Sequence, residues 1–415
     1  MHHISAIKNI MESSHDLENK GMALLSNMWI RRCTLSKRFL LALALLSTYT
    51  ATLSNAYAAR YELRKLGTFG LEEASVAWDI NNDGHVIGDW GTTSESRPFL
   101  WTEPIGLQDL SALDNVDYRS AKGINNRGEI VGARRDSSGF SIAVLRDADG
   151  LVRDLSNPSD EVDAMALSIN DSGKVLGAWG EYAVMWNVED GSRLILGGGD
   201  AYSCISDGGI NDDNKAVWSQ EITVTQNGET LRLSRAFIWD IENGARQLPL
   251  LVGTNTSHVY DINEQGQAVG YSGGHAILWN PDGTVVDLGL GVAYGINNPG
   301  VICGQIDSRA VLWDTDFNIT RLPVFPGSDF SLACGINDLG LIAGGAMLSG
   351  YWGPRAVIWE PVPEPSSLFS LASLLLPVAL SRRKRKWTED CRVFDPEYDD
   401  TYDTVPDKSF TCFGI

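Results

Sequence analysis

The sequence has few cysteines for its length. Its 415 residues include six, which is too few for a framework of disulfides in a chain of this size. No Cys-x-x-Cys or Cys/His spacing indicates a zinc site. In an oxidising compartment, Cys303 with Cys334 and Cys391 with Cys412 remain candidates for isolated bonds. We expect no metal and no cofactor.

Signs of catalysis are also scarce. Beyond residue 58 the chain keeps three histidines, His85, His258 and His275, each in a different part of the sequence. No serine or cysteine lies in a nucleophile-elbow context, and no phosphate-binding loop or dinucleotide motif occurs. We therefore assign no catalytic residue. Enzymatic activity is not excluded, because propeller enzymes assemble their sites from dispersed loop residues.

The sequence has fewer basic than acidic residues, and it has no long apolar run. The chain carries 33 Lys and Arg against 53 Asp and Glu, a net charge of −20. This balance argues against nucleic acid and anionic membrane surfaces, which are bound through clustered basic residues. The apolar runs at 39–46 and 368–380 are shorter than the ~20 residues that cross a bilayer.

The N-terminus has the parts of an export signal. Basic residues between positions 31 and 38 precede the apolar run, and the small residues Ala56 and Ala58 offer a cleavage site. We expect residues 1–58 to be a leader that is removed. The leader is long for such a signal, which leaves a later start codon open.

One phrase recurs seven times through the middle of the chain. Each copy contains an Ile-Asn pair, and successive pairs lie between 34 and 52 residues apart. A period of about 43 residues indicates an array in which each unit buries its apolar face against its neighbours. The pairs are Ile80-Asn81, Ile124-Asn125, Ile169-Asn170, Ile210-Asn211, Ile262-Asn263, Ile296-Asn297 and Ile336-Asn337.

Each repeat predicts four short strands. The Ile-Asn strand runs into a tight turn such as Asn81-Asn82-Asp83-Gly84, in which Asn bonds its own backbone and Gly takes the left-handed position. A second strand ends in Gly, a third closes on Trp, and a fourth ends near Asp-Leu. Four strands in about 43 residues are typical of a propeller blade and unlike a helical solenoid.

The two ends of the array complement each other. The seventh repeat stops after its third strand, near residue 360, while residues 61–67 resemble an unpaired fourth strand. We predict an all-β, seven-bladed propeller of four-stranded antiparallel blades over residues 59–360, closed by the N-terminal strand. Closure removes the exposed edge of a linear array.

Two repeats depart from the pattern. The second has Leu145-Arg146 where the others have Trp, and the fourth has Asn214 and Trp218 in place of the two glycines. We interpret both as drift in a tolerant repeat.

The first turn resembles half of a calcium-binding loop. Asp79 through Gly84 fits the first positions, but Trp90 stands where a bidentate Glu is needed. We interpret the Asn, Asp and Gly of these phrases as turn-forming residues.

Ligand-binding candidates lie on one predicted face. In an antiparallel blade the tight turns share one face and the variable loops the other, where function usually lies. Aromatic residues next to Gly follow several second strands, and with polar neighbours they suit stacking on a neutral sugar. The alternative is that they pack between blades. The candidates are Trp90, Trp179, Tyr271, Tyr351 and Trp352.

The C-terminal part, residues 361–386, resembles the PEP-CTERM sorting signal of Gram-negative bacteria. Its three parts are present in order: a Pro-rich motif, the apolar run at 368–380 and a basic cluster. The resemblance implies a membrane-anchored precursor with a short hydrophobic helix, transient recognition by an exosortase-type membrane protease, and delivery to the cell surface or extracellular matrix. The matching residues are Val362, Pro363, Glu364, Pro365, Arg382, Arg383, Lys384, Arg385 and Lys386.

The last segment departs from that family. Such signals end the protein soon after the basic cluster, whereas this chain continues over residues 387–415 with 8 acidic and 2 basic residues. The composition predicts a disordered tail. Its presence puts efficient sorting in doubt.

The repeats resemble the HAF family of extracellular repeats over about 59–360. That resemblance implies an extracellular location and little about activity. Together these features predict an exported, surface-sorted binding or matrix module, with extracellular polysaccharide as the expected partner. The alternative is a secreted glycan-active lyase or hydrolase on the same scaffold.

Overall fold

The computed structural model describes residues 61–70, 73–92, 96–199, 205–226, 229–350 and 353–362. Several predicted features lie outside these residues: the leader with Ala56 and Ala58, the aromatic pair Tyr351 and Trp352, the sorting signal beyond Val362 with its hydrophobic helix, and the tail. Among the described residues, no helix has the length and apolar character needed to cross a membrane.

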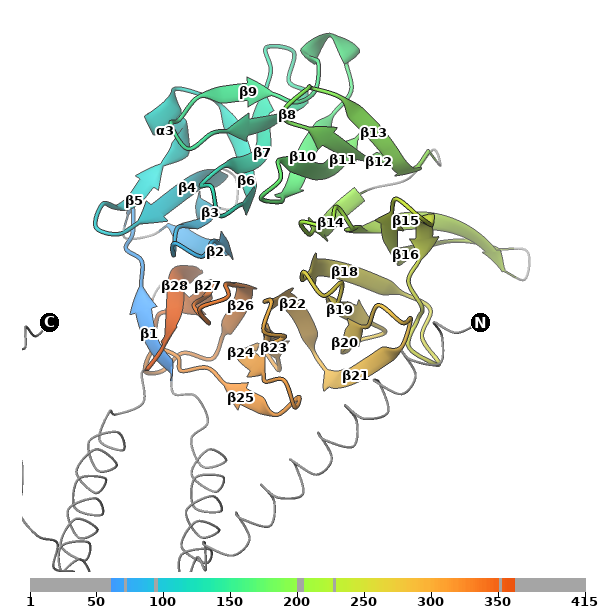
Figure 1. Ribbon diagram of the computed structural model, residues 1–415. Helices are drawn as coiled ribbons and strands as arrows, with labels where there is room; N and C mark the ends of the chain where they lie inside the picture. Colours follow the sequence, from blue (N-terminus) through green and yellow to red (C-terminus); the bar gives the residue numbers. More distant parts are fainter. Residues whose placement is uncertain are drawn as a thin grey trace, which may run out of the picture. The chain divides into compact units, whose positions relative to one another are not determined.

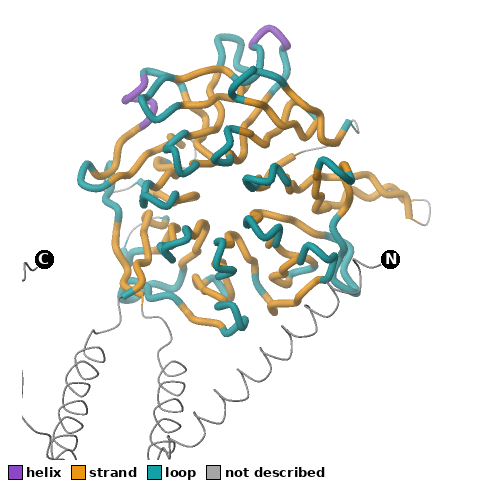
Figure 2. Tube along the Cα trace, viewed as in Figure 1, coloured by secondary structure: helices purple, strands orange, loops and turns teal. Residues whose placement is uncertain are grey.

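The described chain is a seven-bladed β-propeller, as predicted. Seven four-stranded antiparallel sheets follow one another around a central axis (Figure 1). Helix is almost absent from the described residues, and Figure 2 shows it in the connections from blade 1 to blade 2 and from blade 2 to blade 3. These short elements are α3 (Leu110–Asp114), which Asp109 caps, and a 3-10 turn (Pro158–Asp160).

The blades are numbered here in chain order, each from its innermost to its outermost strand. Blade 1 is β2 (Ala74–Ile80), β3 (Val86–Gly91), β4 (Ser96–Thr102) and β5 (Gly106–Asp109); blade 2 is β6 (Tyr118–Ile124), β7 (Ile130–Arg135), β8 (Ser141–Arg146) and β9 (Val152–Asp154); blade 3 is β10 (Ala164–Ile169), β11 (Lys174–Trp179), β12 (Tyr182–Asn187) and β13 (Arg193–Gly198). Blade 4 is β14 (Ile205–Ile210), β15 (Ala216–Gln226), β16 (Glu229–Asp240) and β17 (Gly244–Gln247); blade 5 is β18 (Ser257–Ile262), β19 (Ala268–Ser272), β20 (His275–Trp279) and β21 (Val285–Leu290). Blade 6 is β22 (Val292–Ile296), β23 (Ile302–Ile306), β24 (Arg309–Trp313) and β25 (Ile319–Arg321); blade 7 is β26 (Ser331–Ile336), β27 (Ile342–Met347), β28 (Pro354–Pro361) and β1 (Tyr61–Lys65).

Blade 7 takes strands from both ends of the repeat array. β1 pairs antiparallel with β28, with Tyr61 opposite Pro361 and Leu63 opposite Trp359. The backbone N–H of Leu66 continues this contact by donating to the carbonyl oxygen of Ala356 at 3.1 Å. The first described strand therefore lies on the outer edge of the last blade.

The apolar core lies between the blades. Each of seven buried clusters in the described part of the chain draws its side chains from two successive blades. The Trp that ends the third strand is fully buried in several blades, as in Trp313 and Trp359 at 0% exposure. Burying such a side chain stabilises the fold by about 1.5–3 kcal/mol.

The second glycine of the repeat makes room for this tryptophan. A Cβ atom on Gly344 would collide with the carbonyl oxygen of Leu332 and lie 2.9 Å from Cζ3 of Trp359; one on Gly304 would collide with the carbonyl oxygen of Val292 and lie 3.0 Å from Cζ3 of Trp313. Real Cβ contacts are longer than this, so a larger residue would push away both the innermost strand and the ring. The glycine at the third residue of the second strand is therefore a packing requirement.

The two irregular repeats are compensated by neighbouring side chains. In blade 4, Trp218 occupies the glycine position and is itself fully buried, stacked on Phe237 with ring centroids 5.6 Å apart. In blade 2, the buried Arg146 replaces Trp and its Nε donates to Asp114 at 2.8 Å. Each change comes with a partner that refills the space or neutralises the charge.

The loops divide between two faces. The tight Asn-x-x-Gly turns and the turns between third and fourth strands share one face, where Asp213 and Gly266 line the same groove as Asp240 and Asn243. We refer to it as the turn face and to the opposite one as the loop face. The long β15–β16 hairpin projects from blade 4 on the right of Figure 2.

Candidate functional site

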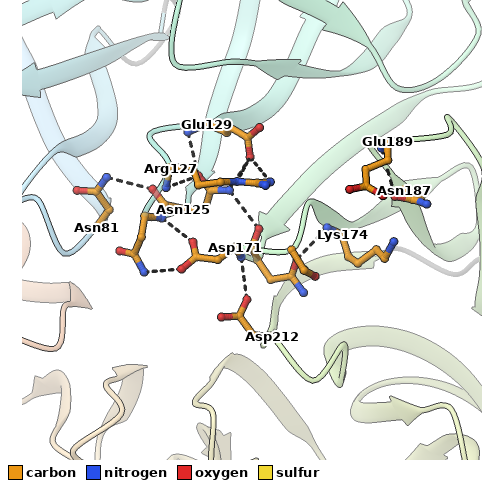
Figure 3. Close-up of polar contacts among 12 residues, drawn as sticks. Asn81, Asn125, Arg127, Glu129, Asp171, Lys174, Asn187, Glu189 and Asp212 are labelled. Carbon is orange, nitrogen blue, oxygen red and sulfur yellow. Dashed lines mark hydrogen bonds and ion pairs between the residues drawn. The ribbon is translucent and has the colours of Figure 1, made fainter.

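A closed ring of hydrogen bonds joins the seven blades at the turn face. Each Asn of the Ile-Asn pairs donates its side-chain Nδ2 to the backbone carbonyl oxygen of the corresponding Asn in the next blade, and Asn337 donates to Asn81. The seven distances lie between 2.8 and 3.2 Å. Figure 3 shows part of this asparagine ring around Asn125. Members are Asn81, Asn125, Asn170, Asn211, Asn263, Asn297 and Asn337.

A second ring lies beside the first. The residue after each ring Asn donates its backbone N–H to the side-chain oxygen of the corresponding residue in the next blade, at 2.8 to 3.1 Å. Figure 3 includes the contact of Asp171 with Asp212. Members of this outer ring are Asn82, Asn126, Asp171, Asp212, Glu264, Asn298 and Asp338.

The ring asparagines also hold their own turns. The Oδ1 atom of Asn81 accepts the backbone N–H of Asp83 at 3.1 Å and that of His85 at 2.9 Å. Turn formation is what the sequence predicted; the contacts between blades were missed. A signal was available, because every repeat places Asn, Asp or Glu, each with a side-chain acceptor, directly after the Ile-Asn pair.

The two rings line a polar cavity of about 410 Å³ at the axis. Asp79 and Asp261 also line it, and their carboxylates accept the N–H groups of Ile124 and Ile296 in the following blades, both at 2.9 Å. Burial raises the pKa of both carboxyls. For Asp261 the pKa reaches about 7, because the nearby charge of Asp79 adds to the effect of burial. Within the described ranges no three metal-ligating side chains gather as a metal site.

The innermost strand of every blade contains a β-bulge. In six blades the pairing register skips one residue two positions before the Ile of the Ile-Asn pair, as at Tyr260 between Val259 and Asp261. In blade 4 it skips two residues, Ser206 and Asp207, one position earlier. A bulge redirects the side chain of the extra residue and often lies beside a functional site. We refer to these residues as the bulge ring: Trp78, Lys122, Leu167, Asp207, Tyr260, Tyr294 and Cys334.

Neighbouring members of the bulge ring touch each other. Lys122 Nζ lies 5.7 Å from the centroid of the Trp78 ring, and Tyr260 meets Tyr294 edge-on with centroids 5.0 Å apart. Trp78 donates its Nε1 to Asp89 at 2.8 Å. Burial raises the pKa of Asp89, while the Trp78 hydrogen bond and the charge of Lys122 oppose that shift. The innermost strands thus bring residues of unlike chemistry together.

Four rings from blades 5 and 6 form one cluster, which we call the aromatic patch: His258, Tyr260, Tyr271 and Tyr294. His258 stacks on Tyr271, its partner across β18 and β19, with centroids 4.8 Å apart and planes 7° apart. Tyr260 lies 6.5 Å from both of these rings. All four side chains remain partly exposed.

The polar atoms of the aromatic patch are largely free of protein partners. None of the three tyrosine hydroxyls forms a hydrogen bond with a described residue, and the buried Nδ1 atom of His258 has none either. Burial lowers the pKa of His258, which favours the neutral imidazole, and raises the pKa of each tyrosine. The patch therefore offers neutral rings and hydroxyls capable of donating and accepting hydrogen bonds.

Two of the predicted ligand residues lie in seams between blades. Trp90 packs at the junction of blades 7 and 1 and stacks on Phe69 at 4.1 Å. Trp179 packs at the junction of blades 2 and 3, with the guanidinium of Arg193 3.7 Å from its ring centroid. One face of each ring is thus occupied by protein, as the packing alternative expects.

Tyr271 is the predicted residue that belongs to the aromatic patch; Tyr351 and Trp352 lie outside the described residues. His258, Tyr260 and Tyr294 were missed as site residues. Their signal was variation at a fixed place, since the position three residues before each ring Asn holds Trp78, Lys122, Leu167, Gly208, Tyr260, Tyr294 or Cys334 while its surroundings repeat.

The two cysteines of the propeller are free thiols. Cys303 is fully buried and Cys334 partly so, and no bond joins them. Burial raises the pKa of both thiols. They act as small packing residues in the described structure.

A scan against protein-family models finds no match, and a search of curated proteins finds none either. Among solved structures, the chain is similar to a streptogramin B lyase, with 11% identity and a TM-score of 0.50 over 72% of this chain and 97% of that one. It is also similar to a catalytically inactive variant of virginiamycin B lyase from Staphylococcus aureus with quinupristin, at 9% identity and a TM-score of 0.48 over 73% of this chain and 100% of that one. A third likeness is to a gluconolactonase-type protein, at 10% identity and a TM-score of 0.36 over 73% of this chain and 93% of that one. At these identities the shared feature is the propeller fold.

Proposed function

We propose that this chain is an exported carbohydrate-binding propeller whose ligand lies against the aromatic patch. The observation that carries the proposal is the cluster of His258, Tyr260, Tyr271 and Tyr294, with three tyrosine hydroxyls that no described residue uses. In this proposal β1 closes the scaffold and the loop face receives the ligand.

The chemistry of the patch suits a sugar. The C–H face of a pyranose ring packs on an aromatic face, while its hydroxyls need donors and acceptors that a tyrosine supplies. A tyrosine side chain also loses little conformational entropy on binding, because it has only two side-chain torsions. His258 and Tyr271 are stacked with their planes 7° apart, so each covers one face of the other and only the outward face of the pair is offered to a sugar.

Export and sorting form the second part of the proposal. It is supported by the signal-like leader and by the PEP-CTERM-like segment from Val362 to Lys386, with its apolar run. In this proposal an exosortase-type protease processes a precursor that the inner membrane holds transiently, and the propeller reaches the cell surface or the exopolysaccharide matrix. Replacing Pro363, Glu364 and Pro365 by Ala should leave the protein in the membrane fraction; unchanged release to the surface would contradict this part.

The binding test compares the patch with a seam. Tyr271→Ala should weaken retention on the host exopolysaccharide about tenfold, since a lost aromatic contact costs about 1 kcal/mol or slightly more. Trp179→Ala serves as the matched aromatic control, and circular dichroism checks the fold of both variants. Retention that falls with Trp179→Ala but not with Tyr271→Ala would move the ligand to the seam and contradict the proposal.

A glycan-active lyase or hydrolase is the second candidate. One observation favours it: the neutral imidazole of His258, whose Nδ1 lacks a described partner, lies beside Tyr260 and Tyr271. A neutral imidazole accepts a proton and a tyrosine hydroxyl donates one. Incubating the purified protein with exopolysaccharide and measuring new reducing ends separates the two functions, because a binding module produces none.

A further inference from the structure

The aromatic patch has a carboxylate beside it. Ser206 and Asp207 together form the bulge of β14, where the pairing register runs from Ile205 to Gly208, and Asp207 is the member of the bulge ring in blade 4. Its negative charge raises the pKa of Tyr260, Tyr271 and Tyr294, after the larger effect of burial, and partly opposes the lowering at His258. The backbone places it there as well: β14 and β18 are the innermost strands of adjoining blades, and a Cβ atom on Gly209, two residues after Asp207, would lie 3.2 Å from the Cα atom of Asp261, which follows Tyr260. Asp207 therefore lies beside the blade 5 part of the aromatic patch.

A second carboxylate reaches the same region. Glu221 follows Ser219 on β15 by two residues, and the Ser219 hydroxyl donates to the carbonyl oxygen of Val259 at 3.0 Å and accepts its N–H at 2.9 Å. This contact holds β15 against the strand that carries His258, and the charge of Glu221 also acts on His258. Neither Glu221 nor Asp207 forms an ion pair with a described residue; the contact of Asp207 is with the Ser206 hydroxyl, which donates to it at 2.8 Å. The patch thus combines electron-rich ring faces with negative charge that the described protein does not neutralise.

The basic member of the bulge ring does not supply that neutralisation. Lys122 lies over the Trp78 ring, and its charge acts on Asp89 of blade 1. Blade 1 is separated from blades 4 and 5 by the intervening blades of the ring. His258 does not supply it either, because burial favours its neutral form.

We propose that the ligand of the aromatic patch is cationic: a polysaccharide whose hexosamine units carry free, protonated amino groups. The inference rests on the proposed carbohydrate-binding function and names the class of sugar. An ammonium group is attracted both to the faces of aromatic rings and to a nearby carboxylate, and the attraction grows as water is excluded. A polymer of uronic acids would instead be repelled by Asp207 and Glu221.

The experiment compares two probes of equal length. Isothermal titration of the full-length protein with a glucosamine hexamer and with an N-acetylglucosamine hexamer, below the pKa of the amines, should give at least tenfold tighter binding of the glucosamine hexamer. Asp207→Asn should reduce that preference about tenfold while leaving the affinity for the acetylated hexamer unchanged. Tyr271→Ala should weaken both probes.

A charge-matched control is needed because the whole chain carries −20. Asp83→Asn removes the same charge from an exposed turn on the other face, and it should leave the preference intact. If Asp83→Asn and Asp207→Asn lower the preference equally, overall charge explains it and the inference is overturned. Equal affinity of the unmodified protein for both hexamers overturns the inference but leaves carbohydrate binding standing; the absence of binding to either hexamer and to exopolysaccharide contradicts the proposed function itself.

Discussion

The asparagine ring and the bulge ring lie only a few residues apart on the same seven strands, yet they differ in almost every respect. The asparagine ring has one residue type, is buried, and uses its polar atoms in contacts with its own turns and the next blade. The bulge ring has a different side chain in nearly every blade, and the hydroxyls of Tyr260 and Tyr294 have no described partner. Identical residues join the blades, whereas the unlike ones range from the buried Leu167 to tyrosines whose hydroxyls have no described partner.

The difference follows from the energetics of buried polar groups. A buried donor or acceptor that loses its partner costs about 1–3 kcal/mol, so each ring Asn is fixed by several contacts at once. A partly exposed tyrosine hydroxyl exchanges one water contact for another at little cost. Substitutions are therefore tolerated at the bulge residues, whereas substitutions of the ring asparagines lower the stability of the fold.

The largest effect is expected at the outer closure of the ring. Removing residues 61–67 would leave β28 as an open edge and expose the cluster around Leu66, which is 5% exposed. We expect a loss of about 4 kcal/mol or more in the free energy of unfolding, measured by urea denaturation, with aggregation through the free edge. The reference is the protein that begins at residue 59; an equal midpoint for the protein that begins at residue 68 would show that the inner rings alone close the fold.

The next effect tests the inner closure. Asn337→Ala removes the donor to the Asn81 carbonyl and the acceptor of the Leu339 and Leu341 N–H groups. Because these groups are left without partners, the free energy of unfolding should fall by about 3 kcal/mol. Asn298→Ala in the exposed outer ring should cost less than about 1 kcal/mol. Comparable losses would remove the distinction between the two rings.

A smaller effect concerns pH. Burial raises the pKa of Asp261 to about 7 in the folded state, well above its value of about 3.9 in the unfolded chain. The folded state therefore binds this proton more tightly, and the contribution of Asp261 to stability falls as pH rises from about 4 to 7. Between pH 5 and 8 the wild-type protein should lose about 2 kcal/mol that Asp261→Asn does not lose. Parallel pH profiles from thermal unfolding, with Asp83→Asn as reference, would contradict this.

The smallest effect is expected in the bulge ring. Tyr260→Phe removes a hydroxyl that has no described protein partner, so the free energy of unfolding should stay within about 0.5 kcal/mol of the wild type. Retention on exopolysaccharide should nonetheless fall a few-fold, because a hydrogen bond to the ligand is lost. A clear loss of stability without loss of retention would assign Tyr260 to the scaffold.

Much of the architecture could be predicted from the repeated sequence. Seven Ile-Asn phrases, their Asn-x-x-Gly turns and the Trp at the end of the third strand predicted seven four-stranded blades, because turn geometry and strand alternation are local properties. The site was less legible. The sequence predicted Tyr271 from its position next to a second strand. Tyr260 and Tyr294 could not be predicted, because their side chains are redirected by a β-bulge that only the strand pairing shows.

The sequence by itself determined the number of blades, their strands and their turns, since each of these depends on residues close together in the chain. Only the tertiary structure decided which polar groups meet across blades. Asn337 and Asn81 are 256 residues apart and lie in contact because the ring closes. The packing of neighbouring blades places Asp207 of blade 4 beside the rings of blade 5, while Trp90 and Trp179 lie in seams. Contacts between separate blades depend on how the sheets pack around one axis, and no spacing within a repeat encodes them.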